Sequence, residues 1–359
     1  MRYSLRSGDS NSYPEDPLIL IQACEFALPE TIIPVSTLLE TDRTRLEQLS
    51  ASLRFYPNLG RTFGAGIQSV RRYNSGHEIS SHVSELVTRL LIGSSLPAPV
   101  DLVVDFSTVP HGNETWGTYV CDDLKSETCR AISITGGGCA NFHMALWSIE
   151  RMLASDSSLQ QVLLISVDQV PDRARVLFPL TFLGDGASGW LINRNRPGWQ
   201  VLGTRLVTAA HLRDAVGLPT RADQPIPVSV SLIETRLLPI HFKAIDRSIR
   251  SLLDEHSMTI DDVNWYIYPC MSSGDRSSFC RAFRVPETKL AGGRMQDAGH
   301  VFATDMAIQF KTLNRVEHAP GTTVMLISAG AGFHWGCTLL RRSDGSMGGT
   351  PARQMEIVM

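Results

Sequence analysis

The sequence predicts an α/β protein made of two similar halves. Short apolar runs alternate along the chain with segments whose apolar residues recur at helical spacing, which is typical of α/β layering with crossover connections. The same order of segments then occurs a second time, as expected for an internal duplication. We therefore expect a first half over residues 17–195 and a second over 196–342, with a disordered lead-in at 1–16 and a flexible tail at 343–359.

Each half contributes the same kinds of elements in the same order. The first half has a helix at His82–Ile92, strands at Val100–Thr108 and Cys129–Ile134, a helix at Phe142–Leu153, and strands at Gln161–Val170 and Gly184–Arg194. The second half has a helix at Ala244–His256, a strand at Val263–Ser273, a helical segment opening at Gly299–His300, and strands at Thr322–Gly332 and Phe333–Arg342. In this alignment Cys139 lies opposite His300, so the duplication predicts two helix starts at one shared pocket.

Composition excludes several classes of function. The 359 residues carry a formal net charge of -3, and the basic residues are scattered, so nothing favours binding to nucleic acid or to an anionic membrane. The N-terminal segment lacks the apolar core of a signal peptide. Seven cysteines without a disulfide-type spacing indicate reduced thiols and a cytoplasmic protein. Motifs for phosphate loops, dinucleotides and zinc proteases are absent, so we expect no cofactor and no metal.

The segment Gly136–Leu146 (GGGCANFHMAL) predicts a nucleophile. Its three glycines permit a tight turn from the preceding strand into the following helix. Cys139 would then lie in the first helical turn, where free backbone N–H groups and the helix dipole favour a thiolate. A small buried cysteine packed behind the turn is the alternative, since free cysteine is commonly buried.

Several motifs resemble those of β-ketoacyl-ACP synthase III, a condensing enzyme of the thiolase fold. They are FGAGIQSVRRYN at Phe63–Asn74, the DFST strand end, the Cys139 motif, FLGDGASGWLI at Phe182–Ile192, and ISAGAGFHWGCTLLR near the C-terminus. The resemblance implies a five-layer αβαβα arrangement of two pseudo-duplicated halves. It also implies a homodimer, although a heterodimer with a homologue is an alternative.

The family's catalytic triad is Cys-His-Asn, and this chain departs from it at two positions. Cys139 matches the nucleophile. Cys270, in YPCMSS, stands where the family has histidine, and His300, in GHVFA, stands where it has asparagine. We expect His300 to act as base toward Cys139, while the role of Cys270 is doubtful because a thiol is a weak donor. Cys139, Cys270 and His300 could also converge on zinc or form a disulfide, but neither spacing nor context indicates metal.

The resemblance also assigns supporting residues. It implies an oxyanion hole from the backbone N–H groups of Cys139 and Ala331. We expect His143, Phe182 and His334 to line the substrate pocket, although buried packing is an alternative for the two histidines. Asp185 is expected to be structural, fixing a turn through side-chain-to-backbone hydrogen bonds.

The function implied is an acyltransferase of fatty-acid-like or polyketide metabolism. Cys139 would take an acyl group from acyl-CoA or acyl carrier protein and pass it to a small-molecule acceptor. Decarboxylative condensation should be impaired, because the two carbonyl donors of the family's triad are altered. A condensing enzyme with an altered triad is one alternative, and a non-catalytic subunit of a heterodimeric ketosynthase is another.

Overall fold

The structure is a computed structural model of the 359-residue chain. It describes residues 19–43, 47, 63–93, 99–109, 115–178, 180–194, 196–212, 237–330 and 333–343. The predicted lead-in at 1–16 and nearly all of the predicted tail at 343–359 lie outside the described residues. Residue 195 is also outside the described residues, so the proposed boundary between the halves at residues 195–196 stays a prediction.

Nine strands of the described chain join in one hydrogen-bonded sheet, in the order β11-β12-β13-β10-β1-β9-β6-β4-β5. Their bounds are β1 Leu20–Ala27, β4 Leu102–Asp105, β5 Arg130–Ser133, β6 Gln161–Asp168, β9 Gly186–Asn193, β10 Trp199–Thr208, β11 Trp265–Ile267, β12 Thr323–Gly330 and β13 His334–Arg342. β9 and β13 each run antiparallel to both of their neighbours.

The strand order repeats, which confirms the predicted duplication. When the strands of each half are numbered along the chain, the first half (β5-β4-β6-β9-β1) has the sheet order third, second, fourth, fifth, first. The second half has the order second, fourth, fifth, first, and Leu290 adds a single bridge to Tyr266 where its third strand would lie. Within the nine-stranded sheet the two halves meet where β1 and β10 pair, at Leu20 with Gln200 and Ile21 with Trp199.

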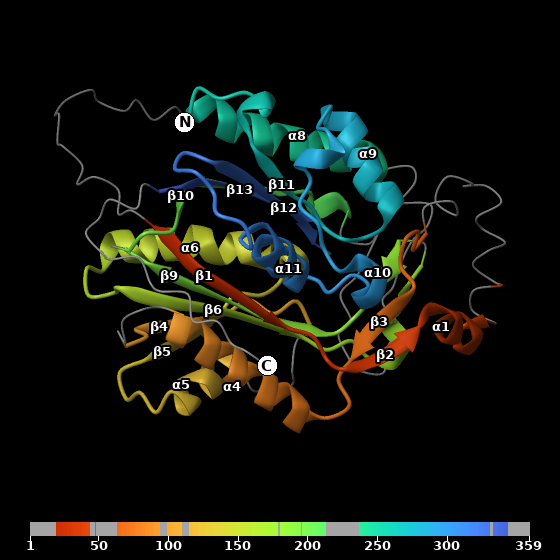
Figure 1. The fold of residues 1–359 in the computed structure, drawn as a ribbon, viewed down its shortest axis with the longest axis horizontal. Helices are drawn as coiled ribbons and strands as arrows, with labels where there is room; N and C mark the ends of the chain where they lie inside the picture. The colour runs from red at the N-terminus through yellow and green to blue at the C-terminus, as the bar shows by residue number, and fades with distance from the viewer. Residues whose placement is uncertain are drawn as a thin grey trace.

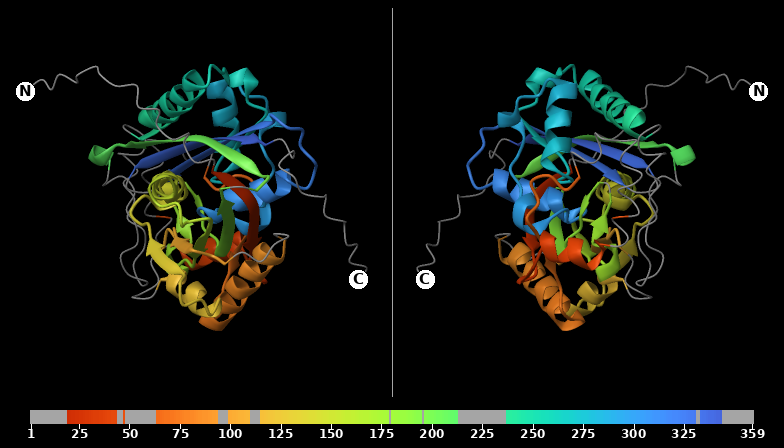
Figure 2. Two further views of the ribbon diagram at one scale, coloured as in Figure 1. Left: turned by 90° about the vertical axis from the view of Figure 1, so that its left-hand side faces the viewer. Right: turned by 90° about the vertical axis from the view of Figure 1, so that its right-hand side faces the viewer.

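The helices form layers that alternate with the two halves of this sheet (Figure 1). Their bounds are α1 Val35–Thr41, α4 Gly76–Gly93, α5 Trp116–Asp123, α6 Asn141–Ser155, α8 Leu238–Glu255, α9 Ser273–Phe283, α10 Met295–Ala298 and α11 Thr304–Leu313. α8 and α9 cover one outer face, α4 and α5 cover the other, and α6 and α11 lie between the two halves of the sheet. The result is the predicted αβαβα arrangement, and the side views show α6 end-on in the middle layer (Figure 2).

Burial follows from this layering. Every residue of β6 and of β9 is buried, because helices cover both faces of their part of the sheet. α6 buries Phe142, Leu146 and Ile149 at helical spacing, as the sequence predicted. None of the described helices is long and apolar enough to cross a membrane.

Some elements differ from the expected bounds. The predicted strand Val263–Ser273 is observed only as Trp265–Ile267, and Ser272 instead caps α9 by accepting from the Asp275 amide at 3.1 Å. The segment between them is a loop that carries Cys270. The helix expected to open at Gly299–His300 begins only at Thr304, so that prediction was wrong.

Two short antiparallel ribbons lie beside the sheet. They are β2 (Thr31–Pro34) with β3 (Ser69–Arg72), and β7 (Val176–Leu177) with β8 (Thr181–Phe182). Asp185 ties them together. Its carboxylate accepts from the Tyr73 and Val170 amides, each at 2.8 Å, and pairs with Arg175 at 2.9 Å. Asp185 is therefore structural, as expected, but it joins segments far apart in the chain instead of fixing its own turn, and Arg175 is its buried partner.

Replacing Asp185 with Ala should lower the free energy of unfolding by about 3–5 kcal/mol, because it leaves the buried Arg175 guanidinium with only the exposed Asp172 carboxylate as an ionic partner. The side chains of Arg175 and Asp185 are only 2% and 0% exposed. Asp246→Ala is the matched control, since Asp246 pairs with Arg250 on an exposed helix face and should cost less than about 1 kcal/mol. Urea denaturation measures both. Equal losses in the two variants would contradict this account.

Candidate functional site

The nucleophile turn forms as the glycines predict. Gly136 and Gly138 adopt φ values of 91° and 57°, a region that a side chain disfavours. Cys139 lies in a 3₁₀ turn, Gly138–Ala140, that runs directly into α6 at Asn141. The thiol therefore lies just before the helix start, and the side chain is 7% exposed.

The turn is fixed from both sides. The Asn141 side chain accepts from the Gly137 amide at 2.8 Å and donates to the Ser107 carbonyl at 3.1 Å. Gly330, at the end of β12, packs against the same backbone. A Cβ on Gly330 would lie 1.8 Å from the Gly137 oxygen and 3.0 Å from the Cys139 nitrogen. The second half of the chain therefore packs directly on the turn.

Cys139, His300 and Asp305 form a linear arrangement in the middle of the molecule. The Cys139 Sγ lies 3.5 Å from His300 Nε2, and His300 Nδ1 lies 2.6 Å from Asp305 Oδ2. The sequence predicted the contact between Cys139 and His300. Asp305 was missed, and it occupies the position of the group that orients the base in a nucleophile–base–acid triad.

Asp305 is held as a carboxylate acceptor by three groups. Besides His300, its oxygens accept from the backbone amides of Cys270 and Val301, each at 3.0 Å. It also lies in the first turn of α11, where the helix dipole favours negative charge. These contacts fix the carboxylate, and the carboxylate in turn fixes the orientation of the imidazole ring.

Opposing effects act on the pKa of His300. Burial alone would lower it, because a buried imidazolium loses its hydration. The charges of Asp305 and Cys139 and their hydrogen bonds outweigh burial and raise the pKa of His300 from 6.5 to about 10. These two neighbours thus favour the doubly protonated imidazole, with Nδ1 facing the Asp305 carboxylate and Nε2 facing the Cys139 sulfur.

The backbone of His300 is clamped by the neighbouring ribbon. The His300 amide donates to the Phe182 carbonyl at 2.9 Å, and the Gly184 amide donates to the His300 carbonyl at 3.0 Å. Gly299 has a φ of 71°, and a Cβ there would lie 2.8 Å from the Phe182 oxygen. Phe182, which the sequence suggested as a substrate contact, thus holds His300 through its main chain.

Cys270 contributes its backbone to the site. Its thiol is turned toward Gln309 Nε2, at 3.6 Å, and toward the Arg276 guanidinium, at 4.0 Å. Burial, followed by the charge of Asp305, raises the pKa of the Cys270 thiol and keeps it protonated. Cys270 does not replace the family's histidine as a strong donor here.

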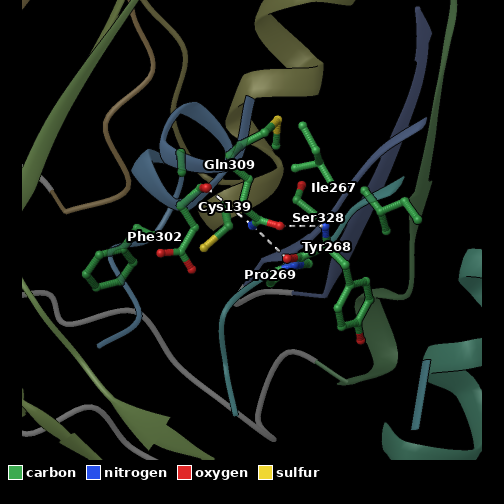
Figure 3. Close-up of a pocket in the computed structure, with 11 residues that line it drawn as sticks. Cys139, Ile267, Tyr268, Pro269, Phe302, Gln309 and Ser328 are labelled. Atoms are coloured by element: carbon green, nitrogen blue, oxygen red, sulfur yellow. Dashed lines mark hydrogen bonds between the residues drawn. The ribbon is translucent and has the colours of Figure 1, made fainter. Parts of the chain in front are cut away.

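A small pocket opens at Cys139, with about 10 Å³ available to the centre of a water-sized sphere. Figure 3 shows Phe302 on one side of Cys139 and Tyr268 and Ser328 on the other. The remaining lining residues are Ile267, Pro269, Ala303, Asp305, Met306, Gln309 and Ile327. Its wall is thus apolar apart from Asp305, Gln309 and Ser328.

The residues predicted to bind substrate lie elsewhere. His143 is fully buried between α6 and the sheet, where its Nδ1 contacts Thr338 at 2.7 Å, and burial lowers its pKa to about 3. His334 begins β13 and contacts Thr208 at 2.8 Å. Neither these histidines nor Phe182 lines the pocket at Cys139. Ala331, the second predicted oxyanion donor, lies outside the described residues.

Asp305 and Gln309 were not predicted as site residues, although their spacing in the sequence gives a weak indication of them. Asp305 follows His300 by five positions, and Gln309 follows Asp305 by one helical turn. This spacing places both on the same face of α11. Among the described residues, no group of three or more His, Cys, Asp or Glu side chains could hold a metal ion.

Comparisons with known proteins identify similar sequences. The family model for the C-terminal part of 3-oxoacyl-[acyl-carrier-protein] synthase III matches residues 253–342. The β-ketoacyl-[acyl-carrier-protein] synthase III of Methylococcus capsulatus is 21% identical over 291 residues, which cover 76% of this chain and 86% of the relative. That of Porphyra purpurea is 22% identical over 299 residues, covering 77% of this chain and 88% of the relative.

Solved structures show the same fold. The 3-oxoacyl-[acyl-carrier-protein] synthase III of Aquifex aeolicus superposes with a TM-score of 0.71 at 18% identity, covering 90% of this chain and 99% of that one. A variant of OleA from Xanthomonas campestris gives a TM-score of 0.71 at 15% identity, covering 91% and 99%. The resemblance to ketoacyl synthase III predicted from the motifs is therefore confirmed: the chain is similar to these synthases in sequence and has their fold.

Proposed function

We propose that the protein is an acyltransferase in which Cys139 carries the acyl group as a thioester. One observation supports this above the others: Cys139, His300 and Asp305 are connected by contacts of 3.5 Å and 2.6 Å. The donor would be acyl-CoA or acyl carrier protein, the substrates of the synthases named above, and the active form a homodimer. Fatty-acid-like or polyketide metabolism is the setting that the relatives' names favour.

The first half-reaction transfers the acyl group to the enzyme. The Cys139 thiolate adds to the donor's thioester carbonyl, and the backbone N–H of Cys139 donates to the resulting oxyanion. The intermediate collapses by breaking the bond between the carbonyl carbon and the donor sulfur. His300 Nε2 gives its proton to the departing thiolate, which leaves as a free thiol. His300 is then neutral, and the enzyme holds a thioester.

The second half-reaction uses the neutral imidazole as a base. His300 Nε2 takes the proton from an acceptor hydroxyl or amine as its oxygen or nitrogen attacks the Cys139 thioester. The carbon–sulfur bond breaks, the thiolate is restored, and His300 again carries both protons. Asp305 keeps Nδ1 protonated throughout, which leaves Nε2 as the nitrogen that exchanges the proton.

Carbon–carbon bond formation is the second candidate, since the relatives that match over most of this chain are named ketoacyl synthases. It needs two donors at the thioester carbonyl as carbon dioxide leaves. Here His300 offers one N–H, because Asp305 occupies the other, and the Cys270 thiol is turned toward Gln309 and Arg276. A non-catalytic subunit is disfavoured because the Cys139–His300 contact is intact.

Incubation with an acyl-CoA or acyl carrier protein should add one acyl mass to the protein, and Cys139→Ala should abolish this adduct. Cys280→Ala, a buried cysteine on α9, is the matched control and should keep it. His300→Ala should lower transfer to an acceptor by about two to four orders of magnitude, since the general base is lost. Full labelling of Cys139→Ala at Cys270 would contradict the assignment of the nucleophile.

The unmodified protein should transfer acyl groups to an oxygen or nitrogen nucleophile faster than it releases carbon dioxide from a malonyl thioester. The double variant Cys270→His with His300→Asn restores the family's donors and should raise carbon dioxide release. Both rates are measured on one preparation, with Cys139→Ala as the blank. Rapid release by the unmodified protein, dependent on Cys139, would assign it to the condensing enzymes instead.

A further inference from the structure

Two cysteines outside the candidate site lie in direct contact. Cys121 is in α5, and Cys129 immediately precedes β5, which lies beside α5 in Figure 1. Their sulfur atoms are 3.0 Å apart, and both are free thiols. A disulfide bond is about 2.05 Å long, so the sulfurs need to approach by about 1 Å to form one.

The short connection between α5 and β5 produces this contact. Lys125 adopts a left-handed φ of 50°, which turns the chain back on itself directly after the helix. The Ser126 amide then donates to the Cys121 carbonyl at 3.5 Å, and the Cys129 amide donates to the Ser126 hydroxyl at 3.2 Å. The two thiols are therefore brought together by the short connection between α5 and β5.

This pair is also the most accessible pair of thiols in the protein. Of the seven cysteines, Cys121 and Cys129 are half-buried, and the other five are buried. Burial, with the hydrogen bond and charge of Cys121, raises the pKa of Cys129 to about 12. The raised pKa of Cys129 favours Cys121 as the thiol that reacts first.

We propose that Cys121 and Cys129 form a reversible oxidation site that takes low-molecular-weight disulfides such as glutathione disulfide. The Cys121 thiolate attacks one sulfur of glutathione disulfide, forms a mixed disulfide and releases one glutathione thiolate. Cys129 then loses its proton and attacks the Cys121 sulfur, which releases the second glutathione. The protein loses two protons and two electrons, and one glutathione disulfide becomes two glutathione thiols.

The Cys121–Cys129 pair lies on elements that lead to the turn carrying Cys139. β5 leads through Ile134 into Gly136, and the Ile134 amide donates to the Asp105 carbonyl at 2.8 Å. The Trp116 amide, at the start of α5, donates to the Asp105 side chain at 2.9 Å. A bond between Cys121 and Cys129 would therefore cross-link two elements that both attach to Asp105 beside the turn. The site does not depend on the proposed transfer reaction.

The test is a titration of the full-length protein with glutathione disulfide and glutathione, followed by mass spectrometry without reduction. The oxidised protein should lose about 2 Da. Trypsin cuts after Lys125 and Arg130, so the peptide 126–130 with Cys129 should stay joined to the peptide with Cys121 until a reductant is added. Cys129→Ser should instead retain one glutathione on Cys121, and Cys280→Ser should behave as the unmodified protein.

Three outcomes would overturn the proposal. They are no mass loss at any ratio of the two glutathione forms, a stable glutathione adduct on Cys121 in the unmodified protein, or a covalent dimer instead of the internal link. Because the readout is the state of Cys121 and Cys129, it is independent of whether Cys139 accepts an acyl group.

Discussion

The hydrogen bond between His300 and Asp305 is the interaction on which the arrangement of the site depends. It joins a loop clamped by Phe182 and Gly184 to the first turn of α11. It also keeps a buried imidazole charged although burial favours the neutral form. Without the carboxylate, the ring would face Cys139 with neither a fixed orientation nor a fixed proton. The site therefore has a cysteine nucleophile, a histidine that can give and take a proton, and a carboxylate that orients the histidine.

The duplicated fold explains why these groups meet. Each half places one loop at the start of a central helix, the turn of Cys139 before α6 and the loop of His300 before α11. Both helices lie in the middle layer. Gly330 from the second half packs on the turn of the first, so the nucleophile is completed only when both halves are folded together. The pocket accordingly takes residues from both halves.

The sequence predicted the features that depend on local chain geometry. The glycines around Cys139, the buried strand β6 and the repeat of elements are all readable from spacing. Asp305 was missed because its role depends on a partner fixed by tertiary contacts. His143 was expected to line the pocket, but its side chain is buried against β13, where Nδ1 contacts Thr338 at 2.7 Å. The position of Cys270 in the site could be predicted from the sequence, but the direction in which its thiol points could not.

The most direct test of this account is the protonation state of His300, followed by nitrogen-15 NMR of the imidazole between pH 5 and pH 11. The account predicts that His300 stays doubly protonated through neutral pH and titrates near 10. In Asp305→Asn the negative charge is lost, so titration should move to lower pH. Titration of His300 near its ordinary value of 6.5 in both proteins would contradict the account.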